Sequence, residues 1–257
     1  HTGAIRAIAV DPNTQIAASG ADDHFVMLWN LKTGKKIGTL NGHSKKILSL
    51  SFTRDGRFLL SGSADKTVRV WNVAKKASTG VYKGHKGEVS AIATLPEKPI
   101  AISASASAKD RSLIRVWNYQ NSIPLGNFTG HRGPVYALAV SLDGKTLVSG
   151  SRDRTLKIWN IKLKRPIKTL GVLDGHRGAI RSVVIADEGR LIASGSDDKT
   201  IIVWSVKSGE IIDQIKKHKA KILGITLSSD SKLLVSSAAD KSVRVWKLVG
   251  NKYSAAN

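Results

Sequence analysis

Strand-forming residues in this chain come in short runs that are divided by turns rich in Asp, Asn, Gly and Pro. A representative stretch has such runs at Ile47–Phe52, Phe58–Leu60 and Thr67–Trp71, with an Arg-Asp-Gly turn between the first two. Runs this short and this closely spaced are typical of antiparallel strands rather than of alternating strands and helices. The pattern therefore predicts an all-β fold in which consecutive strands pair with one another.

Four residue types return at fixed distances along the chain. Each of six histidines is followed 18 residues later by a serine, and five of them are followed 28 residues later by a tryptophan with an aspartate six residues before it. The third copy has four extra residues before Trp117, in 104–110, and we expect them to enlarge the loop between its second and third strands. The fourth copy has three extra residues around 171–174, expected as a longer fourth strand or an added turn. A period of 42–46 residues of this kind predicts a β-propeller with one blade per copy.

Through these His, Ser, Asp and Trp positions the chain resembles the WD-repeat family over essentially its whole length. It departs from the dipeptide that names the family, because Asn, Ser or Lys follows each tryptophan where the family has Asp. The resemblance implies a single β-propeller domain of six four-stranded blades. The six repeats are expected at 1–41, 42–83, 84–129, 130–174, 175–216 and 217–257. Because His1 already occupies a motif position, we expect a piece of a longer protein, and a seventh blade outside the chain stays open as an alternative.

In the family, these four residue types form a buried, hydrogen-bonded tetrad that ties the first three strands of a blade together. Buried imidazole and carboxylate groups cost several kcal/mol unless partners are supplied, so four groups that satisfy one another suit such a site. The resemblance therefore implies a structural role for these residues. The tetrads that we single out are His43, Ser61, Asp65 and Trp71; His131, Ser149, Asp153 and Trp159; His176, Ser194, Asp198 and Trp204; and His218, Ser236, Asp240 and Trp246.

Charge and composition narrow the functional classes. The chain has 41 Lys+Arg against 19 Asp+Glu, a formal net charge of +22, which is more than solubility requires. It has no cysteine, so disulfides, thiolate metal sites and a cysteine nucleophile are excluded. No apolar run is long enough to span a bilayer, and the first residues do not resemble a signal peptide. We expect a cytoplasmic protein, or a nuclear or nucleolar one in a eukaryote, whose partner is selected by charge.

The resemblance also places the loop with the tetrad His and the turn with the tetrad Asp on one face of the propeller, called here the tetrad face. Basic residues follow the Asp or the His in most copies. Five residues after the His, at the mouth of the central channel, several copies have apolar, aromatic or Arg side chains, and Tyr and Arg are frequent at binding hot spots. The predicted partner-binding residues are Arg6, Leu48, Tyr136, Arg181 and Leu223 at the mouth, and Lys66, Arg111, Arg132, Arg154, Arg177, Lys199 and Lys241 around it.

No motif points to an active site. The repeated His, Ser and Asp resemble hydrolase components, but catalysis needs one set in a cleft rather than six buried copies. Neither metal-ligand spacing nor a phosphate-binding Gly-rich loop is present, so we expect no cofactor, metal or small-molecule substrate. The leading hypothesis is a non-enzymatic scaffold that docks an acidic protein partner, or joins a larger complex, through the tetrad face. The alternatives are a nucleic-acid-associated or ribonucleoprotein propeller held by phosphate contacts, and the regulatory propeller of a larger multidomain enzyme.

Overall fold

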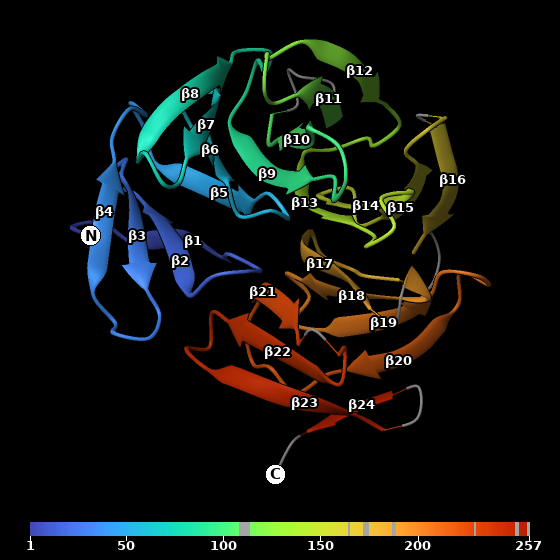
Figure 1. The fold of residues 1–257 in the computed structure, drawn as a ribbon. Coiled ribbons are helices and arrows are strands. Elements are labelled where there is room, and N and C mark those ends of the chain that lie inside the picture. The colour runs from blue at the N-terminus through green and yellow to red at the C-terminus, as the bar shows by residue number, and fades with distance from the viewer. Residues whose placement is uncertain are drawn as a thin grey trace. The chain divides into compact units, whose positions relative to one another are not determined.

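The computed structural model of the chain describes residues 1–107, 114–163, 165–171, 175–186, 189–228, 230–249 and 252–255. In these ranges the regular elements are strands, which form six four-stranded antiparallel sheets, each from four consecutive strands (Figure 1). The all-β, β-propeller fold class predicted from the sequence is confirmed, with one blade for each copy of the repeat. No helix in the described ranges is long and apolar enough to cross a membrane.

The first compact unit, His1–Thr129, holds blades 1 to 3. Its strands are β1 (Ile5–Val10), β2 (Ile16–Ala21), β3 (Val26–Asn30) and β4 (Lys36–Leu40) in blade 1; β5 (Ile47–Phe52), β6 (Phe58–Ser63), β7 (Val68–Asn72) and β8 (Ala77–Tyr82) in blade 2; and β9 (Val89–Thr94), β10 (Ile100–Ser105), β11 (Ile114–Asn118) and β12 (Pro124–Phe128) in blade 3.

The second compact unit, Gly130–Asn257, holds blades 4 to 6. Its strands are β13 (Val135–Val140), β14 (Thr146–Ser151), β15 (Leu156–Asn160) and β16 (Arg165–Leu170) in blade 4; β17 (Ile180–Ala186), β18 (Leu191–Ser196), β19 (Ile201–Ser205) and β20 (Ile211–Ile215) in blade 5; and β21 (Ile222–Leu227), β22 (Leu233–Ala238), β23 (Val243–Val249) and β24 (Lys252–Ala255) in blade 6.

The apolar core lies between neighbouring blades of a unit. In the second unit, β17 packs on β13 and β14, and β21 packs in turn on β17 and β18 (Figure 1). As a result β18, the second strand of the middle blade, is buried at every position. The cluster between blades 4 and 5 includes Val148, Ile158, Ile180 and Trp204, all at most 2% exposed. Burial of such large side chains accounts for much of the stability of the unit.

A glycine in the second strand makes this close packing possible. A Cβ on Gly150 would lie 2.6 Å from Ile180 Cγ2, and a Cβ on Gly195 would lie 2.5 Å from Ile222 Cγ2, both contacts with the first strand of the next blade. Real Cβ atoms do not approach so closely, so these positions require glycine. The equivalent residues of blades 3 and 6 are Ala104 and Ser237.

The extra residues of the third copy lie between its second and third strands, as expected, since β10 ends at Ser105 and β11 begins at Ile114. The first two residues of the stretch 104–110 in which we placed them belong to β10 instead, and Ala104 and Ser105 are fully buried. Ala104 pairs with Ala91 on one side and Ile114 on the other, because the strand must cover its neighbours for the full width of the sheet. The surplus residues therefore follow Ser105. Residues 108–113, with Asp110 and Arg111, lie outside the described residues, as do the extra residues 172–174 of the fourth copy.

Candidate functional site

Blade 4 shows the geometry of a tetrad. His131 precedes β13, Ser149 lies in β14, Asp153 follows β14 and Trp159 lies in β15. His131 Nε2 lies 2.7 Å from Ser149 Oγ, and His131 Nδ1 lies 2.8 Å from Asp153 Oδ2. The Trp159 indole N–H donates to Ser149 Oγ at 2.8 Å. One proton arrangement fits all these contacts: the Nδ1–H of a neutral imidazole donates to the carboxylate, the serine hydroxyl donates to Nε2, and the serine oxygen accepts from the indole.

The same contacts recur in the other blades. They join His43, Ser61, Asp65 and Trp71 in blade 2, His176, Ser194, Asp198 and Trp204 in blade 5, and His218, Ser236, Asp240 and Trp246 in blade 6. Blade 1 joins His1, Ser19, Asp23 and Trp29 in this way. In blade 3, His85 and Trp117 both contact Ser103.

The carboxylates of Asp65, Asp153 and Asp198 are held in the ionised form. Burial alone raises the pKa of the Asp153 carboxyl, but hydrogen bonds from His131, Thr155 and the Arg132 backbone N–H outweigh it and hold the pKa well below its usual range. Asp65 and Asp198 show the same balance, with burial opposed by their histidine and threonine partners. The network therefore combines an ionised carboxylate with hydrogen-bond partners that satisfy it.

The burial of the tetrad side chains argues against a catalytic role for them. Ser149 is fully buried and the His131 side chain is 0% exposed, so a substrate cannot reach the hydroxyl or the imidazole. The serine hydroxyl is also engaged with both the histidine and the tryptophan. Over the described residues there is no group of three or more His, Cys, Asp or Glu side chains that could hold a metal ion.

The basic positions around the tetrads lie on both sides of the buried carboxylate. The residue after the tetrad His donates its backbone N–H to that carboxylate, as Arg132, Arg177 and Lys219 do at 2.8 Å. The residue after the tetrad Asp occupies the turn on the other side. The predicted cations in these two positions are exposed; they are Lys66, Arg132, Arg154, Arg177, Lys199 and Lys241, and Arg111 lies outside the described residues.

The turn after the tetrad Asp has a left-handed backbone that the sequence did not reveal. Four basic residues have positive φ there, 72° at Lys66, 70° at Arg154, 72° at Lys199 and 65° at Lys241. Glycine and asparagine adopt this conformation easily, whereas other residues carry strain of about 1–2 kcal/mol. An exposed lysine or arginine with this backbone conformation lowers the stability of the fold. Residues that are kept in spite of such strain often have a functional role.

The residues predicted at the channel mouth comprise aromatic or apolar side chains and arginines that are already paired with aspartates. Tyr136 and Arg181, from neighbouring blades, are brought together, with the guanidinium carbon 4.3 Å from the centre of the tyrosine ring. Leu223 is 53% exposed, and Leu48 is half-buried. Arg6 and Arg181 are not free cations, because each makes a two-pronged ion pair with the aspartate that precedes a tetrad Asp. The partners are Asp22, at 2.9 and 2.6 Å, and Asp197, at 2.9 and 2.7 Å.

Asp22 and Asp197 are site residues that sequence reasoning missed, although a signal was present. Aspartate doublets, 22–23 and 197–198, occur in the two blades that have Arg at the mouth position. Blades 2, 4 and 6, with Leu48, Tyr136 and Leu223 there, have Ala or Arg before the tetrad Asp. The two positions thus vary together among the repeats of one chain, and side chains in contact are expected to do so.

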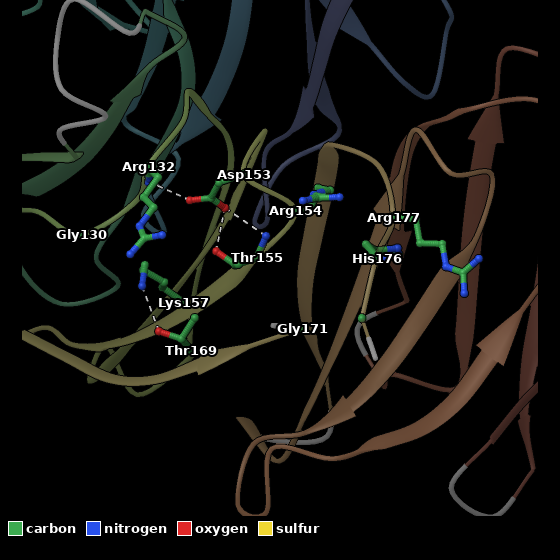
Figure 2. A pocket seen from close by; sticks show the side chains of 11 residues that line it. Gly130, Arg132, Asp153, Arg154, Thr155, Lys157, Thr169, Gly171, His176 and Arg177 are labelled. Carbon is green, nitrogen blue, oxygen red and sulfur yellow. Dashed lines mark hydrogen bonds between the residues drawn. The ribbon is translucent and has the colours of Figure 1, made fainter. Parts of the chain in front are cut away.

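A pocket of about 610 Å³ opens beside the blade 4 tetrad, within the second unit. Its cations are Arg132 and Arg154 on the two sides of Asp153, Lys157 on β15, and Arg177 at the start of blade 5; Figure 2 shows Arg154 between Arg132 and Arg177. Lys157 Nζ donates to Thr169 Oγ1 at 2.9 Å across to β16. The other lining residues are Gly130, Asp153, Thr155, Thr169, Gly171, Gly175 and His176.

Comparisons with known proteins agree with this geometry. The family model described as WD domain, G-beta repeat matches residues 1–30, 34–72, 122–160, 167–205 and 209–247. Over 53 residues (20% of this chain, 6% of the relative) the chain is 42% identical to a Periodic tryptophan protein 2 homolog of Schizosaccharomyces pombe. Over 60 residues (23% and 18%) it is 43% identical to Eukaryotic translation initiation factor 3 subunit I of Botryotinia fuckeliana. Over 53 residues (21% and 16%) it is 43% identical to Small ribosomal subunit protein RACK1 of Brassica napus. Each match spans less than a fifth of the relative's own length.

Proposed function

The chain belongs to the WD40 repeat family, and from that premise we propose that it is a non-catalytic scaffold whose tetrad face docks an acidic protein partner. The observation that carries the proposal is the series of exposed cations at left-handed turns, Lys66, Arg154, Lys199 and Lys241. A residue kept at a strained position without a buried role is most simply explained by what its side chain binds. The blades then supply a rigid frame, and the turns supply the specificity.

The relatives support a partner that is part of a large assembly. The names of two of them describe a subunit of a translation initiation factor and a protein of the small ribosomal subunit. A cytoplasmic protein that joins a complex of this kind fits the formal net charge of +22, since opposite charge raises the rate of encounter. The absence of a reachable nucleophile in the tetrads supports a binding role over a catalytic one.

We expect the mouth residues to anchor the partner and the turn cations to steer it. Tyr136 and Arg181 form a compact aromatic and guanidinium pair, and Asp197 already neutralises the arginine. Such a pair offers contact area and hydrogen bonds rather than net charge, which is typical of hot spots that control dissociation. The exposed turn cations act over longer distances and control association.

The test is affinity capture from a native extract with the tagged chain, with and without nuclease, followed by titration of the recovered partner. The proposal expects capture of an acidic protein that survives nuclease, and faster dissociation of that protein from the Tyr136→Ala variant. Capture that disappears with nuclease would instead favour the nucleic-acid-associated alternative. For that alternative, log affinity should fall linearly with log salt, with a slope of about −0.7 to −0.9 per phosphate neutralised, and Tyr136→Ala should have little effect.

A further inference from the structure

We propose that the pocket beside the blade 4 tetrad binds the phosphate of a phosphorylated serine or threonine on the protein partner. This inference rests on the proposed docking function and adds to it a specific chemical group. Arg132, Arg154, Lys157 and Arg177 supply four positive charges to the pocket. A phosphomonoester, with a charge of about −1.5 to −2 at neutral pH and three terminal oxygens, is the group that such an arrangement suits.

The carboxylate in the pocket, Asp153, makes no ion pair with these cations. Asp153 accepts hydrogen bonds from His131 Nδ1 and the Arg132 backbone N–H, both at 2.8 Å. It also accepts from the backbone N–H and the hydroxyl of Thr155, at 3.0 and 2.6 Å. Within the described ranges, no acidic side chain makes an ion pair with Arg132, Arg154 or Arg177. The guanidinium groups are therefore available to an anion from outside.

Two glycines of the pocket, Gly171 and Gly175, lie against each other. Gly171 and Gly175 flank the three residues that the fourth copy inserts, and a Cβ on Gly175 would overlap Gly171 Cα. Gly171 has a φ of +83°, and a Cβ there would lie 3.5 Å from the Arg154 carbonyl oxygen. The backbone at Gly171 thus runs close to the backbone of Arg154.

Within a single unit, the set around blade 4 has more cations than the sets at the equivalent positions around blades 1, 2 and 5. The corresponding positions around blade 1 are occupied by Thr2, His24, Met27 and Ser44, without a Lys or Arg. Those around blade 2 are Ser44, Lys66, Arg69 and Lys86, and those around blade 5 are Arg177, Lys199, Ile202 and Lys219. Each of these two sets has three cations, one fewer than the set around blade 4.

The shape favours a phosphorylated side chain over a nucleic-acid backbone. A phosphodiester carries one charge and two terminal oxygens per nucleotide, so tight binding of a strand needs cations along a track. Here the four cations line a single pocket of about 610 Å³. Arginine binds phosphate and carboxylate alike through paired N–H groups. The higher charge and the third terminal oxygen of a phosphomonoester favour it over a carboxylate where several cations line one pocket.

The experiment measures binding of a fluorescein-labelled peptide, Gly-Gly-phosphoserine-Gly-Gly, to the intact chain by fluorescence anisotropy. The test variant is Arg154→Asn and the matched control is Lys66→Asn. Both variants lose one positive charge from a left-handed turn, with φ of 70° and 72°, where asparagine fits well. Arg154→Asn should weaken binding at least tenfold, while Lys66→Asn should change it less than twofold. Equal weakening in the two variants would mean that only overall charge matters and would overturn the proposal.

Two further arms test the identity of the ligand. Peptides with serine or glutamate in place of phosphoserine should bind at least tenfold more weakly, and phosphopeptide binding should strengthen from pH 5 to pH 7 as the phosphate, with a pKa of about 6, loses its second proton. A glutamate peptide that binds equally well would overturn the proposal. So would a five-nucleotide RNA that binds equally well and with the same dependence on Arg154. If the pocket fails these tests while reversal of all four turn cations still slows docking of the captured partner, the proposed scaffold function stands without the phosphate site.

Discussion

Ser149 is the most informative single residue of the blade 4 tetrad, because two other side chains depend on its hydroxyl. Its oxygen accepts from the Trp159 indole at 2.8 Å, and its proton is donated to His131 Nε2 at 2.7 Å. All of this lies in the interior, with Ser149 and Trp159 at 0% exposure. Replacing the serine by alanine removes the hydroxyl that hydrogen-bonds both the indole N–H and the imidazole nitrogen.

The cost follows from these two orphaned groups. A buried donor or acceptor that loses its partner costs roughly 1–3 kcal/mol, so Ser149→Ala should lower the free energy of unfolding by roughly 2–6 kcal/mol. For a chain of this size each kcal/mol corresponds to roughly 2–4 °C in Tm. We therefore expect a fall of roughly 5–20 °C, measured by circular dichroism at pH 7. Ser44→Ala, at an exposed position, is the control and should stay within about 0.5 kcal/mol.

A double-mutant cycle separates the hydrogen-bond network from packing. Trp159→Phe removes the indole N–H that donates to the serine oxygen. In that background, Ser149→Ala no longer deprives the indole of its acceptor. The double variant with Ser149→Ala should then cost less than the sum of the single variants, by roughly 1–2 kcal/mol. Costs that add to within about 0.5 kcal/mol, or a Ser149→Ala variant as stable as the Ser44→Ala control, would refute the interpretation of the tetrad as a mutually dependent buried network.

Three other predictions concern packing, backbone strain and protonation. Gly150→Ala should lower the free energy of unfolding, measured by urea titration, by roughly 1–3 kcal/mol through its clash with Ile180. Gly80→Ala should be tolerated, because the nearest atom to the added Cβ would lie 3.6 Å away. Lys199→Asn should raise Tm slightly, since it relieves about 1 kcal/mol of left-handed strain, and an unchanged or lower Tm would contradict the strain argument. Because hydrogen bonds lower the folded-state pKa of Asp153, the unfolded chain binds protons first as the pH falls. Stability should therefore be full above about pH 5 and decline below the ordinary carboxyl pKa of about 4; Asp153→Asn should be less stable at pH 7 and show a shallower decline in melting scans.

Strand order and tetrad membership could be read from the sequence because both rest on local chemistry at fixed spacing. A buried carboxylate, imidazole and indole can satisfy one another only if the residue types are kept, so they repeat visibly every 42–46 residues. The apolar runs marked the strands for the same reason. In the third copy the longer loop was predicted but its start was placed too early, since Ala and Ser in 104–105 look like loop residues and yet occupy fully buried strand positions.

The left-handed turns and the pocket could not be predicted, because they depend on backbone conformation and on which separate segments lie together in the fold. Nothing in the letters Asp-Arg at 153–154 indicates that the arginine has a left-handed backbone. The pocket is lined by Arg132, Arg154, Lys157 and Arg177, which come from three separate segments. Their spacing in the sequence does not show that they line the same pocket. The arginines paired with aspartates are an intermediate case. The aspartate doublets could be seen in the sequence, but only the ion pair between Arg181 and Asp197 in the structure explains them.

The central claim, that exposed cations on the tetrad face steer an acidic partner, is tested most directly by reversing four of them together. The measurement is the association rate constant of the captured partner with the variant carrying Lys66→Glu, Arg154→Glu, Lys199→Glu and Lys241→Glu, from 50 to 300 mM NaCl. Glutamate is no worse suited than lysine to these turns, so circular dichroism should show an unchanged fold. We predict a rate at least roughly tenfold slower at 50 mM salt, a flatter salt dependence, and a dissociation rate that changes little. A variant with the wild-type association rate and the wild-type salt slope would contradict the claim.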